Sequence, residues 1–282
     1  MRVIQTISDL RAALPARRTV SLVPTMGNLH DGHLSLVRLA HEHGGLVVAS
    51  IFVNPLQFAP NEDFAKYPRT LERDCELLAG SGCDIVFAPD PQEIYPQAQV
   101  YAVQPPAPLA DILEGSVRPG FFTGVCTVVL KLFNIVRPNI AVFGKKDYQQ
   151  LLIITEMVRQ LNLPIDIQAA ETVREAGGLA LSSRNGYLDD QQRIEAAQLH
   201  GTLLAACGEA RLGRNDWPTI ERAAQDYLVK RGWQPDYVAI RRRADLRVPP
   251  PADPRVPPAL QSLVILGAAR LGETRLIDNL EL

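Results

Sequence analysis

The sequence has few of the features that would place it in a class by composition alone. Its 282 residues hold no Cys-x-x-Cys pair, and the longest apolar stretch is residues 46–53. A membrane-spanning helix needs about 20 apolar residues, so this stretch is far too short to cross a bilayer. Lys plus Arg total 29 against 31 for Asp plus Glu, a net charge of −2. This balance argues against nucleic-acid binding driven by bulk electrostatics.

The four cysteines also argue against a structural metal or a secreted fold. Cys75, Cys83, Cys126 and Cys207 are widely separated and have none of the spacings typical of zinc sites. They indicate buried small hydrophobic side chains in a reducing compartment. The chain reaches Asp9 before any apolar core, so we expect no signal peptide. With 46% hydrophobic and 21% charged residues, we expect a cytoplasmic enzyme with an ordinary core.

The first half of the chain alternates between strand-like and helix-like segments. Apolar periodicity predicts strands at residues 19–23, 46–53, 84–87, 140–143 and 165–169, and helices at 33–43, 70–79, 124–136 and 148–161. Such alternation favours a parallel sheet with right-handed crossovers, which is a doubly wound α/β domain. Ligands of these sheets lie beyond the carboxyl ends of the strands. The loops after Val23, Val53 and Phe143 should therefore face one crevice.

The second half changes character and predicts a smaller α+β domain. Two helical patterns at residues 190–212 and 217–231 precede strand-like runs at 237–241 and 263–266, with a proline-rich connector at 249–258 between the runs. The sheet pattern of the first half ends near residues 171–178. We therefore predict two domains, at residues 1–173 and 174–282.

The segment at residues 24–33, Pro-Thr-Met-Gly-Asn-Leu-His-Asp-Gly-His, lies between the first predicted strand and helix. Gly27 and Gly32 allow the backbone to approach a ligand, and the helix N-terminus offers free N–H groups to a phosphate. His30 and His33 can donate hydrogen bonds to phosphate oxygens as charge develops. The alternative is a loop with surface or metal-binding histidines. We favour nucleotide binding, because the segment has a strand before it and a helix after it. The lack of a nearby cysteine or third histidine further disfavours a metal site.

This segment resembles the nucleotide-binding segment of pantothenate synthetases, which belong to the His-x-Gly-His nucleotidyltransferase superfamily. The resemblance continues, in order, through residues 50–58, 67–71, 143–151, 181–188 and 275–279. It implies a Rossmann-like first domain, a C-terminal lid domain and a homodimer. The implied reaction condenses pantoate with β-alanine through a pantoyl adenylate, using ATP with Mg²⁺ and releasing AMP and pyrophosphate.

The resemblance also implies roles for individual residues. His33, His30 and Lys146 would act on the reacting phosphate, and Gln57, Gln150 and Asn54 would bind pantoate. The implied ATP-binding residues are Met26, Gly27, Asn28, Leu29, His30, Asp31, Gly32, His33, Gly144, Lys145, Lys146, Asp147, Val173, Leu181, Ser182, Ser183 and Arg184.

Two carboxylates keep alternative interpretations. Asp74 either organises Mg²⁺ or simply favours the start of its helix through the helix dipole. Asp147 either holds the ribose, caps the next helix, or does both.

The sequence departs from the family pattern at three places. Lys145 stands where the family usually has an acid. Phe121 replaces a histidine, and Thr123 replaces a charged residue. An acidic residue is also missing after the Ile240–Arg241 pair. These changes leave open what the loop around Phe121 contributes to substrate binding.

Two other functions compete with the ligase. A related nucleotidyltransferase would act on a phosphorylated partner, which calls for an additional basic pair rather than the neutral amides of Gln57 and Gln150. A catalytically silent nucleotide-binding protein would have little reason to keep both His30 and His33.

Overall fold

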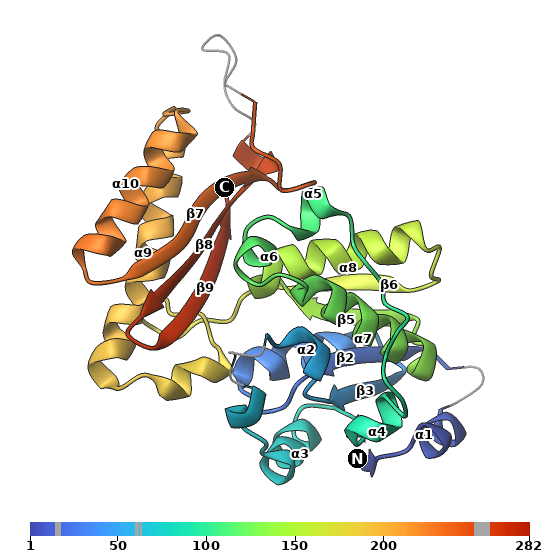
Figure 1. Cartoon of the computed structure of the whole chain (residues 1–282). Coiled ribbons are helices and arrows are strands. Elements are labelled where there is room, and N and C mark those ends of the chain that lie inside the picture. The colour runs from blue at the N-terminus through green and yellow to red at the C-terminus, as the bar shows by residue number, and fades with distance from the viewer. Residues whose placement is uncertain (15–17, 60–61, 63, 251–259) are drawn as a thin grey trace. The chain divides into compact units, whose positions relative to one another are not determined.

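The computed structural model describes residues 1–14, 18–59, 62, 64–250 and 260–282. The chain divides into two compact units (Figure 1). The first contains residues 1–145 and 150–171, and the second contains residues 146–149 and 172–282. The short segment 146–149 thus groups with the C-terminal part of the chain, although it lies between two segments of the first unit.

The first unit is built on a six-stranded parallel sheet with the strand order β1-β4-β3-β2-β5-β6. This arrangement confirms the predicted doubly wound α/β fold. The strands are β1 (Arg2–Ile4), β2 (Val20–Thr25), β3 (Leu46–Ile51), β4 (Ile85–Phe87), β5 (Ile140–Gly144) and β6 (Asp166–Ala170).

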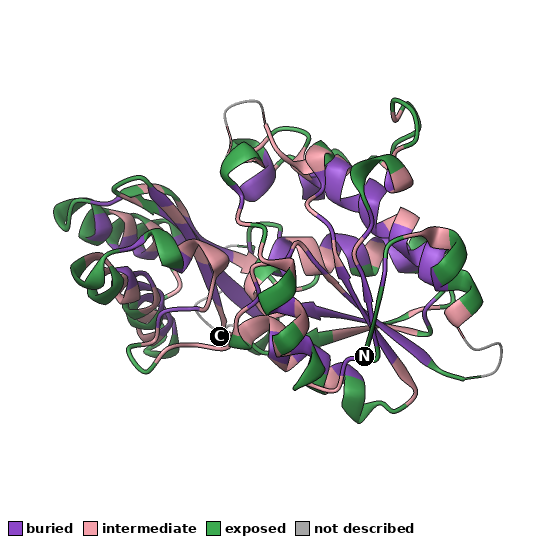
Figure 2. Cartoon of the chain, turned by 90° about the horizontal axis from the view of Figure 1, so that it is seen from below, coloured by how far each residue is buried: buried purple, intermediate pink, exposed green. Residues whose placement is uncertain are grey.

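Helices cover the sheet because its central strands are apolar on both faces. Helix α2 (Asp31–Glu42) packs with α3 (Leu71–Ala79), and α1 (Ile7–Ala13) packs with α7 (Phe121–Val136). The strands between these helices are largely buried (Figure 2). The buried residues of α2 recur at helical spacing and meet the sheet at Val47 and Val142. The other helices around this sheet are α4 (Pro91–Ile94), α5 (Ala107–Ala110), α6 (Glu114–Val117) and α8 (Tyr148–Gln160), with short 3₁₀ turns η1 (Pro55–Gln57), η2 (Phe64–Lys66) and η3 (Lys145–Asp147).

The strand order places a topological switch point between β2 and β5. From β2 the chain proceeds outward to β3 on one side, and β5 pairs with the other side of β2. The carboxyl ends of β3, β2 and β5 are therefore adjacent, as the sequence predicted. Loops that leave these ends can share a ligand.

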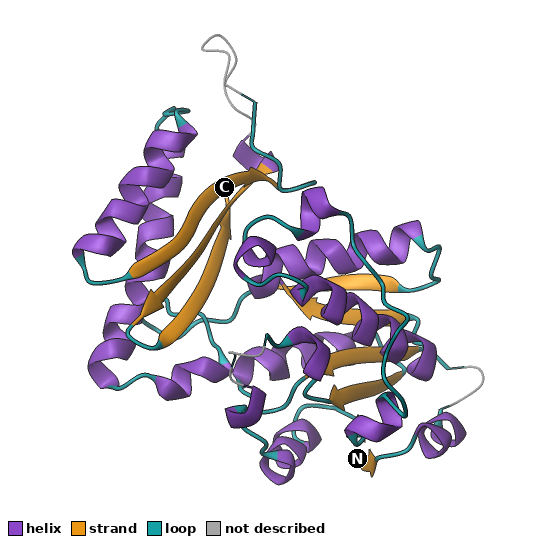
Figure 3. Ribbon diagram, in the orientation of Figure 1, coloured by secondary structure: helices purple, strands orange, loops and turns teal. Residues whose placement is uncertain are grey.

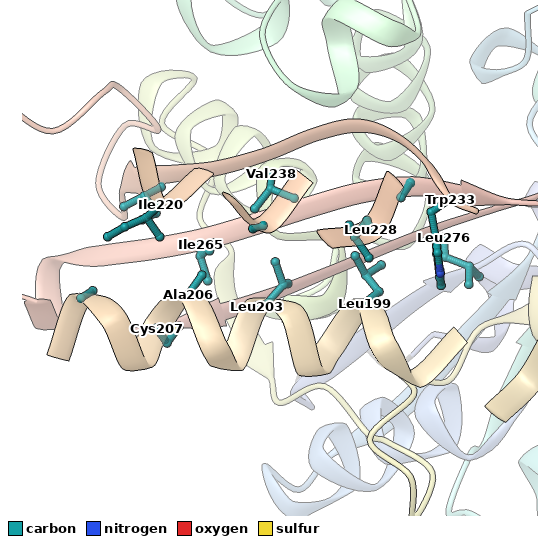
Figure 4. Close-up of a cluster of buried hydrophobic side chains, with 14 of the residues drawn as sticks. Leu199, Leu203, Ala206, Cys207, Ile220, Leu228, Trp233, Val238, Ile265 and Leu276 are labelled. Carbon is teal, nitrogen blue, oxygen red and sulfur yellow. The ribbon is translucent and has the colours of Figure 1, made fainter. Parts of the chain in front are cut away.

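The second unit packs two helices against a three-stranded antiparallel sheet of order β7-β8-β9 (Figure 3). The strands are β7 (Gln234–Arg242), β8 (Leu263–Leu271) and β9 (Thr274–Glu281), and the helices are α9 (Asp190–Arg211) and α10 (Trp217–Lys230). Leu199 and Leu203 of α9 share a core with Leu228 and with Ile265 of β8 (Figure 4). This small α+β unit confirms the predicted character of the second half.

The sequence missed some elements of the fold. Strand β1 is only three residues long, and β9 alternates buried and half-buried positions rather than forming one apolar run. Helix α7 begins at Phe121 rather than at residue 124. Most of the proline-rich connector at residues 249–258 lies outside the described residues. Within the described part of the chain, no helix is both long and apolar enough to cross a membrane.

Candidate active site

The loop between β2 and α2 has a backbone conformation that few residues adopt. Gly27 has a φ of 83° and Asn28 a φ of 51°. A Cβ at Gly27 would lie 3.1 Å from both an oxygen of Asp74 and the side chain of Ile51. Glycine is therefore favoured at position 27 by the positive φ, and these close contacts leave little room for a side chain. The loop brings the backbone of residues 27–30 to the carboxyl end of β2.

Asp74 of α3 holds this loop in place. Its side chain is fully buried, and its two oxygens accept hydrogen bonds from the backbone N–H of Asn28 (2.9 Å) and Leu29 (2.8 Å). The Thr70 hydroxyl also donates to it (3.1 Å). A carboxylate engaged in this way has no oxygen turned toward solvent. We therefore do not keep Asp74 as a magnesium ligand, and we assign it to holding the loop.

The two histidines lie at the start of α2, with ring centroids 4.1 Å apart. His30 precedes the helix, and its backbone N–H points to Nδ1 of His33 at 3.4 Å. Because Nδ1 accepts this bond, we assign a proton to Nε2 of His33. The Nε2–H group can then donate to an anion. Asp31 and Gly32 supply the first-turn N–H groups, which lack partners within the helix.

A network of amides follows β3. Asn54 is buried, and its Nδ2 donates to Oε1 of Gln57 (3.1 Å) and to the carbonyl of Gly124 (3.2 Å). Tyr95 donates its hydroxyl to Oδ1 of Asn54 (2.7 Å), and burial raises the pKa of Tyr95, so it stays a donor. Nε2 of Gln57 lies 3.1 Å from Sδ of Met26. Since a thioether is a weak acceptor, this N–H remains able to bind a stronger one.

Helix α7 fixes the same turn from the other side. A side chain at Gly124 would overlap the carbonyl of Leu56, so only glycine lets α7 approach the Pro55–Gln57 turn this closely. Arg118 donates to the carbonyl of Gln57 (3.2 Å) and forms two bonds with Glu62 (2.6 and 2.7 Å). The guanidinium carbon of Arg118 also stacks 3.7 Å above the ring of Phe121.

The loop after β5 begins with Gly144, which is half-buried. Lys145 pairs with Glu171 at 2.5 Å, so its charge is matched within the first unit. On α8, Gln150 is half-buried whereas Gln149 is buried. Of these two neighbouring amides, Gln150 is therefore the more accessible one.

In the second unit, Val173 and Leu181 lie opposite each other in a short hairpin. The N–H of Leu181 donates to the carbonyl of Val173 (3.0 Å), and Arg174 pairs with Ala180. The hairpin leads into a 3₁₀ turn, η4 (Ser183–Tyr187), capped by the hydroxyl of Ser182. Ser182, Ser183 and Arg184 are all half-buried.

The remaining predicted residues of the second unit lie on the segment 146–149. Lys146 is half-buried and Asp147 is exposed, at the junction of η3 with α8. Asn279 of β9 donates to the backbone carbonyl of Lys146 at 2.9 Å. Thus the predicted ATP-binding residues fall into two groups, one built on β2 and β5 and one assembled beside β9.

Sequence reasoning missed the residues that support these side chains. Tyr95, Arg118 and Gly124 hold the Gln57 turn, yet each is an ordinary residue until the fold places it. The sequence drew attention to this region only through Phe121 and Thr123, which depart from the family pattern. Among the described residues, no group of three or more His, Cys, Asp or Glu side chains could hold a metal ion.

Comparison with known proteins identifies close relatives over the full chain. A family model described as pantoate-β-alanine ligase matches residues 2–281. A pantothenate synthetase from Leptothrix cholodnii is 59% identical over 288 residues, covering 100% of both chains. The crystal structure of pantothenate synthetase from Thermus thermophilus matches with a TM-score of 0.92 and 46% identity, covering 100% of this chain and 99% of that one.

A third relative was solved with ligands. The pantoate-β-alanine ligase from Francisella tularensis, complexed with "Beta-gamma ATP" and β-alanine, matches with a TM-score of 0.82 and 33% identity. The match covers 100% of this chain and 97% of that chain.

Proposed function

This chain belongs to the pantoate-β-alanine ligase family, and on that premise we propose how its residues carry out the reaction. The enzyme condenses pantoate with β-alanine and converts ATP to AMP and pyrophosphate. The residue assignments rest on one observation, the contact between Gln57 and Met26. This contact brings the loop that carries His30 and His33 together with the Gln57 turn, at the carboxyl ends of β2 and β3.

In the first step, the pantoate carboxylate attacks the α-phosphorus of ATP and pyrophosphate leaves. Negative charge grows on the phosphate oxygens during this step. We assign Nε2–H of His33, together with His30 and the first-turn N–H groups of α2, to stabilising that charge. Because these donors are held before ATP arrives, they need little rearrangement during the reaction.

The pantoate site follows from the chemistry of a hydroxy acid. Such a molecule carries hydroxyl groups, which both donate and accept, and a carboxylate, which accepts. The Gln57 amide can both donate and accept, so it can bind either kind of group. Its Oε1 already accepts a hydrogen bond from Nδ2 of Asn54, which leaves Nε2 of Gln57 facing outward. We assign Nε2 of Gln57 to pantoate, with Gln150 as a second amide.

In the second step, the β-alanine amine attacks the acyl carbon of the adenylate. The new C–N bond forms, the bond from that carbon to the phosphate oxygen breaks, and AMP leaves as the amine loses a proton. This step needs the adenylate to be kept from water. We assign Lys146, Val173 and the residues 181–184 to holding the nucleotide through both steps.

The predicted magnesium ligand, Asp74, does not fit that role. Asp74 is buried and fully engaged, and the described residues contain no cluster of metal-binding side chains. We propose that Mg²⁺ arrives on the oxygens of the ATP phosphates, which are the ligands it prefers. The homodimer and the cytoplasmic location stay predictions from the family resemblance.

A single-turnover assay tests the proposal. With ATP and pantoate alone, the enzyme should release pyrophosphate in an amount matching the active sites, and AMP should appear only after β-alanine is added. Pyrophosphate release without pantoate, or AMP release without β-alanine, would contradict an acyl-adenylate route.

His33→Ala tests the assignment of the phosphate donors. Loss of one preorganised donor typically costs on the order of a hundredfold or more in rate, so the pyrophosphate burst should slow to that extent. The matched control is His43→Ala, at the exposed end of the same helix, which should keep the wild-type burst. Equal rates in the two variants would remove His33 from the mechanism.

A further inference from the structure

The motif at residues 275–279 has no role in the reaction described above. It lies on β9, and its last two residues, Asp278 and Asn279, are buried at 4% and 6% exposure. Burying a carboxylate and an amide in a strand is unfavourable unless each has partners. Two of their partners, Arg174 and the carbonyl of Lys146, lie on the segments to which the nucleotide is assigned.

Asp278 is bound to the hairpin that carries Val173. Arg174 donates to both carboxylate oxygens of Asp278, at 2.6 and 2.8 Å. Nδ1 of His200, on α9, lies 3.3 Å from the same carboxylate. Burial alone would raise the pKa of Asp278, but the hydrogen bonds from His200 and Arg174 and the Arg174 charge hold it below its ordinary value. The carboxylate is therefore charged at neutral pH.

Arg174 in turn fixes the shape of the hairpin. Its guanidinium also donates to the carbonyl of Gly178 in the hairpin turn (3.1 Å) and to the carbonyl of Asn279 (3.3 Å). Gly178 has a φ of 94°, and a side chain there would lie 2.8 Å from the His200 ring. The hairpin is thus pressed onto α9 and tied to β9, and the chain leaves it directly into Ser182.

Asn279 holds the other segment. Its Nδ2 donates to the backbone carbonyl of Lys146 at 2.9 Å. Two positions further along β9, Glu281 accepts a hydrogen bond from the hydroxyl of Tyr148 (3.2 Å) and pairs with Arg243 (2.7 Å). Alternate residues of one strand therefore fix the backbone at Lys146 and the side chain of Tyr148.

We propose that Asp278 and Asn279 are positioning residues, which set the two nucleotide-holding segments of the second unit in register with each other. Asp278 acts through Arg174 on the hairpin that leads to residues 182–184, and Asn279 acts on Lys146. Because the two are neighbours on one strand, a shift of either segment strains the other. This inference rests on the proposed assignment of Lys146 and residues 182–184 to ATP.

The experiment compares Asp278→Asn with Asp236→Asn in the full-length enzyme. Asp236 also pairs with an arginine of β9, Arg275, at 2.7 Å, so the control removes a similar ion pair. We expect Asp278→Asn to lower kcat/KM for ATP by about ten- to a hundredfold, since a misplacement of about 1 Å can cost a hundredfold. KM for pantoate at saturating ATP should stay at the wild-type value. The control should change neither constant.

Asn279→Ala is the second variant, because it removes the bond to Lys146 while leaving the Arg174–Asp278 pair in place. It should also raise KM for ATP selectively, and thermal denaturation reports whether either variant is folded. If Asp278→Asn does not fold, Asn279→Ala decides. The positioning role would be overturned if the variant had the same kinetic constants as the control, or if it weakened the use of ATP and of pantoate equally.

A double variant separates this inference from the proposed function beneath it. The variant that combines Asp278→Asn with Arg184→Ala should have a kcat/KM for ATP no lower than that of Arg184→Ala alone, because both substitutions act on the same segment. Additive losses would contradict the inference while leaving Arg184 in the site. If Arg184→Ala itself leaves ATP use unchanged, the assignment of the segment fails, and the positioning role fails with it.

Discussion

Asp74 offers the sharpest test of how the nucleotide loop is held. In Asp74→Ala, the backbone N–H groups of Asn28 and Leu29 lose their acceptor. Leaving a buried donor unpaired costs about 1–3 kcal/mol. Leu29 is 1% exposed and bears the full cost, whereas Asn28 is half-buried and can partly regain a bond from water. The variant should therefore lose about 2–4 kcal/mol of unfolding free energy.

This loss is measurable by heat or urea in the absence of nucleotide and metal. At about 2–4 °C per kcal/mol for a protein of this size, Tm should fall by roughly 4–16 °C. Asp74→Asn keeps one good acceptor and should lose about half as much. The matched control is Glu72→Ala, an exposed acid in the same first turn of α3, which should leave Tm almost unchanged.

The same variants distinguish a structural carboxylate from a magnesium ligand. A displaced loop should lower kcat/KM for ATP at every Mg²⁺ concentration, by up to about a hundredfold. A lost metal ligand would instead leave Tm at the wild-type value and let excess Mg²⁺ restore the rate. Observing that second pattern in Asp74→Ala would refute the reasoning from burial.

The contact of Tyr95 and the pKa shifts of Asp278 and the cysteines can each be tested. Tyr95→Phe removes the hydrogen bond to Asn54, which is worth about 0.5–1.5 kcal/mol, so KM for pantoate should rise about two- to tenfold. The control is Tyr101→Phe, at an exposed position. Equal KM values in the two variants would show that Tyr95 does not support the pantoate site. The pKa of Asp278 is lowered from about 3.8, so its stabilising effect is present above that pH and lost as pH falls below it. The difference in urea midpoint between the wild type and Asp278→Asn should therefore become smaller at acidic pH. A difference that stays the same at every pH would show that the charge of Asp278 does not cause it. Burial raises the pKa of three thiols, those of Cys83 (about 11), Cys126 (about 12) and Cys207 (about 11). Alkylation of the native protein near pH 8, followed by mass spectrometry, should therefore find these thiols unmodified, whereas they should react in denaturant.

The sheet and its main helices could be predicted because their periodicity is local. The apolar runs that became β2, β3 and β5 are buried on both faces, and α2 repeats its buried residues at helical spacing. The alternation of strand and helix then placed the loops after these strands at one edge. Strand β9 was missed because only one of its faces is consistently buried, which gives no continuous apolar run.

The supporting contacts of the site could not be predicted, because each joins residues far apart in the chain. Asp74 meets Asn28 across 46 positions, and Arg174 meets Asp278 across 104. Nothing local in the sequence distinguishes Asp74 from any acid in a first helical turn. The fold gives Asp74 a role that neither interpretation named, because α3 closes over the loop and the buried carboxylate accepts bonds from the loop backbone.

Two of the departures from the family pattern, Lys145 and Phe121, find partners in the structure. Lys145, in place of an acid, finds Glu171 at 2.5 Å, so the added charge is neutralised beside the loop. Phe121, in place of a histidine, lies beneath Arg118, and the pairing with Glu62 orients the guanidinium over the ring. A stacked cation contributes about 0.5–2 kcal/mol, and a bidentate carboxylate adds directional bonds.

Arg118 thereby keeps its bond to the Gln57 carbonyl even though the histidine is gone. At the start of α7, Phe121 gives the guanidinium an aromatic platform, and the turn that carries Gln57 is held from both sides. Arg118→Lys separates this support from the effect of charge alone. Lysine keeps the positive charge, but it can neither form the paired bonds to Glu62 nor stack a planar group on Phe121. It should raise KM for pantoate, measured at saturating ATP, relative to the exposed Arg137→Lys. An unchanged KM would mean that Asn54 and Gly124 alone suffice to hold the turn.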